Sequence, residues 1–145
     1  MHWQWDPSLS VGINVIDNQH RRIVEYINEL ADAMERKDRT AVGGILDGMI
    51  DYTLTHVGFE ESLMDRAGYP IAAEHKLVHQ SFAKRMTDYK RRFNEGGDIT
   101  RQLFSDLQMW LTNHIKRDDK DYSRAVRTVL EETGWIRKAL SRFFG

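Results

Sequence analysis

Four stretches of the sequence repeat apolar residues at intervals of three and four positions, the spacing of a helix with one buried face. They lie at about 18–36, 41–66 and 71–93, and from about 99 onwards. Short breaks containing glycine or proline separate the later stretches, and no segment alternates apolar and polar residues as a strand would. Four helices of similar length joined by short loops predict an all-α, up-down-up-down four-helix bundle.

Polar and flexible residues mark the expected helix ends. Asp17 and Asp98 stand where side chains commonly cap the first turn, so they are predicted as N-caps of the first and fourth helices. Gly68 suits the C-cap of the second helix, and Pro70 suits the opening of the third. The residues before Asn18 form a predicted extended arm, whose Trp3, Trp5 and Ile13 can pack along the bundle.

The end of the chain has two interpretations. Residues 124–133 continue a helical pattern, and 135–144 form a short helix that is basic and carries no acidic residue. The favoured expectation is that this helix folds back on the bundle. The alternative is a docking helix for a protein partner or an anionic membrane surface. The predicted boundaries are a bundle domain at 1–122 and a C-terminal helical extension at 123–145.

The composition excludes several classes of function. The chain has 145 residues, which suits one domain, and 21 Lys and Arg against 22 Asp and Glu, which indicates no nucleic-acid partner. There is no cysteine, so disulfides, thiolate metal sites and cysteine nucleophiles are excluded. No apolar run reaches the roughly 20 residues that span a bilayer, and the N-terminus lacks signal-peptide features. A cytoplasmic protein is therefore expected, and a membrane partner is disfavoured.

Five of the six histidines fall on the predicted inner faces. They are His20, His56, His75, His79 and His114. His56 with Glu60, and His75 with His79, are pairs four residues apart, so both members of each pair lie on one helix face. A single histidine on an apolar stripe is more often a hydrogen-bonded core residue than a ligand. Here every helix contributes one, and burying them all without a metal would cost several kcal/mol.

The number of candidate ligands indicates two metal ions. Asp118 and Asp119 follow shortly after His114 and can supply a second carboxylate besides Glu60. Five imidazoles and two carboxylates are too many for one transition metal. Two six-coordinate ions offer about twelve positions. The imidazoles fill five of them, two bridging carboxylates fill four, and a bridging oxide or hydroxide fills two, which leaves one position open. A site with one vacancy is suited to binding a small ligand, whereas a structural site would be closed.

The motifs together resemble those of bacterial hemerythrins, over roughly Trp3 to Tyr122. The matching segments are Trp5, Ser10-Val11-Gly12-Ile13, Ile16-Asp17-Asn18-Gln19-His20, His56-x-x-x-Glu60-Glu61, Tyr69-Pro70, His75-x-x-x-His79-x-x-Phe82 and Trp110-Leu111-x-x-His114-Ile115-x-x-x-Asp119-x-x-Tyr122. Each motif alone is weak, but the ordered set is specific.

The resemblance implies a di-iron centre that binds dioxygen reversibly without catalytic turnover. It assigns His75, His79 and His114 to one iron, and His20 and His56 to a second iron that keeps the open position. Glu60 and Asp119 would bridge the two ions, together with an oxide or hydroxide. Dioxygen is the expected partner, and it would bind at the open iron.

Asp119 conflicts with regular helix geometry. It lies five residues after His114, which places the two about 140° apart around an α-helix, whereas Asp118 at four residues fits better. The family pattern selects Asp119, and a π-type bulge would bring it onto the same face.

Apolar side chains beside the ligands are the predicted lining of an oxygen pocket. Leu111, three residues before His114, is the first candidate; Ile115, Val57 and Ile23 are weaker ones. Such a lining would exclude water from the bound ligand. The simpler interpretation is that Leu111 only fills the core.

A di-iron enzyme is the main alternative function, acting as an oxidase or peroxidase or handling nitric oxide. Such enzymes use the same bundle with Glu-x-x-His motifs, and this sequence contains none. Imidazole ligands also donate less negative charge than carboxylates, which disfavours high-valent iron. Metal storage is a third alternative, because imidazoles accept zinc and other divalent ions as well. Whether the oxygen is delivered, stored, sensed or scavenged stays open at this point.

Overall fold

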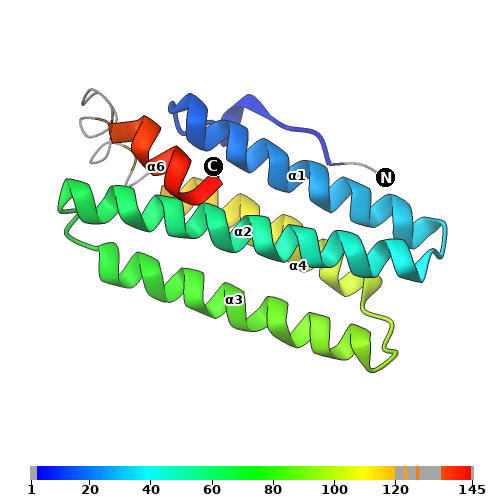
Figure 1. Cartoon of the computed structure of the whole chain (residues 1–145). Helices are drawn as coiled ribbons and strands as arrows, with labels where there is room; N and C mark the ends of the chain where they lie inside the picture. The colour runs from blue at the N-terminus through cyan, green and yellow to red at the C-terminus, as the bar shows by residue number, and fades with distance from the viewer. Residues whose placement is uncertain (1–2, 120–122, 124–126, 128–134, 145) are drawn as a thin grey trace.

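The computed structural model describes residues 3–119, 123, 127 and 135–144, with the backbone alone at 100, 118–119 and 135–136. Every regular element in these residues is helical (Figure 1). In chain order they are η1 (Pro7–Leu9), α1 (Asn14–Glu35), α2 (Arg39–Ala67), α3 (Ala72–Asn94), α4 (Thr100–Asn113), η2 (His114–Asp119) and α6 (Trp135–Phe144). Helices α1 to α4 alternate in direction, so the predicted four-helix bundle is confirmed.

The core follows the apolar stripes that the sequence predicts. In α1, Ile16, Ile23, Ile27 and Leu30 recur at helical spacing and are almost fully buried. Helix α1 packs against α2 and α4, and α2 also packs against α3. None of the described helices combines the length and apolar content that crossing a membrane would require.

The end of α2 is formed as predicted. Gly68 has a φ of 65°, in the left-handed region that glycine enters without a steric penalty. Its amide donates to the carbonyl of Asp65, and the amide of Tyr69 donates to that of Met64. These bonds satisfy carbonyl groups in the last turn, and α3 then begins at Ala72.

The two predicted N-caps are wrong. Helix α1 begins at Asn14, one turn earlier than expected, and Asp17 lies inside it. The Asp17 carboxylate instead accepts hydrogen bonds from the Ser10 hydroxyl at 2.6 Å and the Val11 amide at 2.9 Å. At α4 the N-cap is Ile99, which makes no side-chain capping bond, rather than Asp98. The contacts of Asp17 with the preceding arm override its local preference for a cap.

The N-terminal arm packs along α1, as expected, although it contains the short turn η1. The amide of Trp3 donates to the Asn28 side chain at 2.7 Å, and the Asn28 amide donates back to the Trp3 carbonyl at 2.9 Å. The Arg21 guanidinium lies over the Trp5 ring. Leu9, Val11 and Ile13 are buried in the core.

Helix α6 lies against α2 toward the end of the bundle where α1 begins (Figure 1). Ala139 is buried, and the rings of Phe143 and Phe144 contact Phe59 of α2. The expectation that 135–144 folds back on the bundle is therefore confirmed. The helical pattern expected at 124–133 falls on residues that, apart from Arg127, lie outside the described part of the chain.

Candidate metal centre

Helices α1, α2 and α3, together with η2, which continues α4, send side chains that could hold a metal into one region of the core. These side chains are His20 from α1, His56 and Glu60 from α2, His75 and His79 from α3, and His114 at the start of η2. Each is at most 4% exposed. The inner faces predicted from helical spacing are thus occupied by these six residues. Every predicted ligand whose side chain the structure describes lies in this region.

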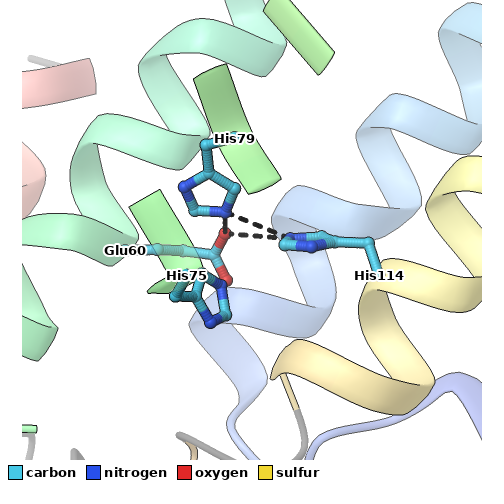
Figure 2. Close-up of side chains that lie close together, drawn as sticks. All are labelled: Glu60, His75, His79 and His114. Carbon is cyan, nitrogen blue, oxygen red and sulfur yellow. Dashed lines mark hydrogen bonds and ion pairs between the residues drawn. The ribbon is translucent and has the colours of Figure 1, made fainter. Parts of the chain in front are cut away.

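Four of the six residues form the first group. Donor atoms of Glu60, His75, His79 and His114 all lie within 4.8 Å of one another. Glu60 Oε1 is 3.6 Å from His79 Nε2 and 3.5 Å from His114 Nε2, and these two nitrogens are 3.4 Å apart (Figure 2). Figure 2 shows the three imidazoles arranged around the Glu60 carboxylate. Nitrogen and oxygen donors that converge in this way can surround one ion.

The second group consists of His20, His56 and Glu60, again with donor atoms within 4.8 Å of one another. His56 Nε2 lies 3.0 Å from Glu60 Oε1, and the His20 and His56 rings meet edge to face at 4.7 Å. Glu60 therefore belongs to both groups. A carboxylate in this position can join two neighbouring ions.

Gln19 orients the His56 ring. Its side-chain oxygen lies 2.5 Å from His56 Nδ1. An amide oxygen can only accept a hydrogen bond, so Nδ1 must carry the proton. In the neutral imidazole the other ring nitrogen, Nε2, then carries no proton, and it lies 3.0 Å from Glu60 Oε1, where it could bind a metal.

Glu61 has the same relation to His79. Its carboxylate oxygen lies 3.2 Å from His79 Nδ1, which leaves Nε2 facing the first group. Burial raises the pKa of Glu61, while the nearby positive charge of Lys76 acts in the opposite direction. Helical spacing alone predicts no role for Gln19 or Glu61. Each adjoins a predicted ligand on its own helix but contacts a ligand on a neighbouring helix.

An aromatic stack supports His114. The Trp110 ring lies parallel to the His114 ring at 4.7 Å and parallel to the Phe82 ring at 3.6 Å. The indole thus lies between α3 and the imidazole and limits the rotation of the histidine. The contact between Trp110 and His114 could have been predicted from their four-residue spacing, because such a pair shares a helix face.

The backbone after His114 takes the form that Asp119 would require. The segment η2, His114–Asp119, is a π-helix, in which the hydrogen bond closes at the fifth residue. The predicted bulge is therefore present in the backbone. The side chains of Asp118 and Asp119 lie outside the described part of the chain.

The four predicted pocket residues are all buried near the ligands. Leu111 and Ile115 are fully buried beside His114, and Ile23 and Val57 are nearly so. Their lining of an oxygen pocket stays a prediction.

The donor set suits a transition metal. Imidazole nitrogens bind iron, zinc, copper or nickel, and a carboxylate adds negative charge that balances the cations. Burying the Glu60 carboxylate and five imidazoles in a dry core would cost folding free energy if no metal cation were bound among them. The residues therefore fit a metal site, and the fit alone leaves the choice of metal open.

Comparison with known families gives a match over most of the chain. Residues 11–126 match the model of the hemerythrin HHE cation binding domain. A bacteriohemerythrin of Stenotrophomonas maltophilia is 45% identical, and the match covers 97% of both chains. The bacteriohemerythrin of Pseudomonas aeruginosa is 43% identical over 99% of both chains. That of Methylococcus capsulatus is 33% identical over 77% of this chain and 87% of its own.

Solved structures agree with the sequence matches. A crystal structure of a wild-type hemerythrin superposes with a TM-score of 0.81 at 28% identity, covering 86% of this chain and 97% of its own. A variant of a hemerythrin with a leucine replaced by alanine matches with the same score.

Proposed function

The chain belongs to the hemerythrin family, and we propose that it binds dioxygen reversibly at a centre of two iron ions. The observation that carries the proposal is the position of Glu60, whose carboxylate is shared by a group of three histidines and a group of two. One shared carboxylate between two buried imidazole groups is the arrangement expected for a pair of ions.

The ligands divide unequally between the two ions. His75, His79 and His114 hold one iron, and His20 and His56 hold the other. Glu60 bridges them, and Asp119 is the second bridging carboxylate, in keeping with the π-helical backbone that leads to it. The side with two histidines has fewer protein ligands and therefore keeps the open coordination position.

Bound iron would supply the electrons that dioxygen needs to bind, and the protein controls access and orientation. Gln19 and Glu61 hold their histidines with Nε2 toward the centre. Leu111, Ile115, Val57 and Ile23 exclude water from the open position. This exclusion favours release of intact dioxygen over protonation and loss of the ligand in its reduced form.

The proposed role is non-catalytic, as an oxygen carrier, store or sensor. Five of the seven proposed ligands are neutral imidazoles, which stabilise high-valent iron less than carboxylates do. The names of the related bacteriohemerythrins agree with this role. The cytoplasmic location expected from the sequence remains a prediction.

Anaerobic loading with ferrous iron, followed by cycles of oxygenation and deoxygenation, tests the proposal. Metal analysis should give two irons per chain, and a visible absorption band should appear with oxygen and vanish without it. His2→Ala, the histidine outside the ligand set, should leave both results unchanged, whereas His56→Ala should lower iron content. A band that forms once and decays with steady substrate oxidation would instead identify an oxidase.

A further inference from the structure

Thr53 is a buried polar residue beside the site to which no role has been assigned. It lies in α2, three residues before His56 and seven before Glu60, so it shares their helix face. It is 2% exposed. Its side chain therefore lies in the core next to the ligands of α2.

The register of the helices identifies its neighbours. Because the bundle helices alternate in direction, residues that follow the ligands in α1 and α3 lie level with residues that precede them in α2 and α4. Two ring contacts support this register: Tyr26 meets Tyr52 at 5.8 Å, and Phe82 stacks on Trp110 at 3.6 Å. The layer next to the ligands thus consists of Ile23, Thr53, Phe82 and Leu111, all at most 3% exposed. Thr53 supplies the polar group of that layer.

The hydroxyl of Thr53 differs from those of two other helical threonines. Thr55 donates to the carbonyl of Asp51 at 2.8 Å, and Thr87 donates to that of Ala83 at 3.0 Å. These bonds to the preceding turn are the usual way in which a helix satisfies a threonine. The buried Thr53 Oγ1 makes no hydrogen bond within the described part of the chain. Buried polar groups are almost always paired, so this hydroxyl calls for a partner of another kind.

We propose that the Thr53 hydroxyl donates a hydrogen bond to the small ligand in the open position on the His20–His56 side. The inference rests on the proposed function, because that function supplies the ligand. Thr53 precedes His56 by one turn on α2, and Ile23 follows His20 by one turn on α1, so these two residues form the part of the layer next to the two-histidine side. A single donor in an apolar layer selects ligands whose outer atom accepts a hydrogen bond, such as dioxygen or azide.

Azide binding to the oxidised, iron-loaded protein measures this hydrogen bond. Thr53→Val keeps the shape of the side chain and removes the donor, so azide should bind about 5- to 10-fold more weakly. Thr53→Ser keeps the donor and should bind azide nearly as well as the unmodified protein. Thr87→Val, an exposed threonine on α3, is the matched control and should change nothing.

Melting of the iron-free protein provides a second readout. Thr53→Val should melt at the same temperature as the unmodified chain or higher, because a methyl group replaces a buried hydroxyl that has no partner. A clearly lower melting temperature would overturn the inference, since it would reveal a structural hydrogen bond.

The inference also fails if Thr53→Val binds azide as tightly as the unmodified protein. Loss of iron loading in this variant would overturn it too, because a hydroxyl that meets only the incoming ligand is not needed to hold iron. By contrast, an unmodified chain that takes up no pair of irons would refute the proposed function itself. The two failures are therefore distinguishable.

Discussion

Replacing Gln19 by leucine tests whether the orientation of His56 governs metal binding. The Gln19 side chain accepts a hydrogen bond from His56 Nδ1 and is 5% exposed, so water cannot take its place. Leucine has a similar size but offers no acceptor. The substitution therefore removes one hydrogen bond with little loss of packing.

The magnitude depends on how the imidazole responds. If Nδ1 keeps its proton, a buried donor loses its partner, which costs about 1–3 kcal/mol of unfolding free energy. If the proton moves to Nε2, it can be donated to Glu60, 3.0 Å away, and the iron-free protein loses less stability. The metal-binding nitrogen is then blocked. In either case iron affinity should fall about 10- to 100-fold, equivalent to roughly 1.4–2.8 kcal/mol.

Two measurements on the same variant separate these responses. Competition with a chelator gives the iron affinity, and nitrogen NMR of the histidine side chains gives the protonated position in the iron-free protein. Asn18→Leu is the matched control, since Asn18 is exposed and its side chain accepts a hydrogen bond from the exposed Arg21 rather than from a histidine. If Gln19→Leu binds iron as tightly as the control, Gln19 does not orient a ligand.

Four further predictions concern other parts of the molecule. Leu111→Ala should lower the free energy of unfolding by about 2–5 kcal/mol. If Leu111 also excludes water, the oxygenated form of the variant should decay faster at a temperature where both proteins are folded. Equal decay rates would mean that Leu111 only packs the core. Asp119→Ala should impair iron loading while Asp118→Ala spares it, as metal analysis can show; the reverse result would reject the assignment. Burial is the larger cause, and a hydrogen bond to a carboxylate the second, of a rise in the pKa of Tyr89 from 10.0 to about 12. The stabilising contribution of Tyr89 is therefore complete below pH 10 and is lost as the pH rises through 12. Tyr89→Phe should flatten the fall of unfolding free energy in that interval, measured by denaturant titration. Deleting 135–145 should leave oxygen binding intact but lower the melting temperature, because α6 covers part of α2; loss of the site would place the tail in the core.

The helices and the cluster of buried histidines around Glu60 could be predicted because both follow from one periodicity. A histidine three residues before Ile23 or four before Glu60 must share its face, whatever the rest of the chain does. The family resemblance selected Asp119, which would need a π-type turn after His114, and the backbone has one. Helical spacing therefore determines which side chains meet in the core.

The helix ends and the hydrogen-bond partners of the ligands depend on contacts between segments, so spacing could not predict them. Asp17 has the composition of an N-cap but bonds to the preceding arm, which lets α1 begin one turn earlier. Gln19 adjoins His20 in sequence but contacts His56, because its side chain faces α2. No local pattern identifies such a partner before the packing of the helices is known.

The first turns of α1 show how closely these contacts are connected. Asp17 binds the arm, Gln19 orients His56, and His20 is itself a proposed ligand, all within four consecutive residues. The rotation of α1 that places His20 beside His56 also brings Gln19 to His56 Nδ1, and the arm bonds of Asp17 oppose a change in that rotation. A displacement of the arm would therefore act on the two-histidine side first, because His20 and His56 both depend on this turn. The three-histidine side draws its imidazoles from α3 and η2 and lacks this dependence. The arm thus supports the side of the centre to which the open coordination position is assigned.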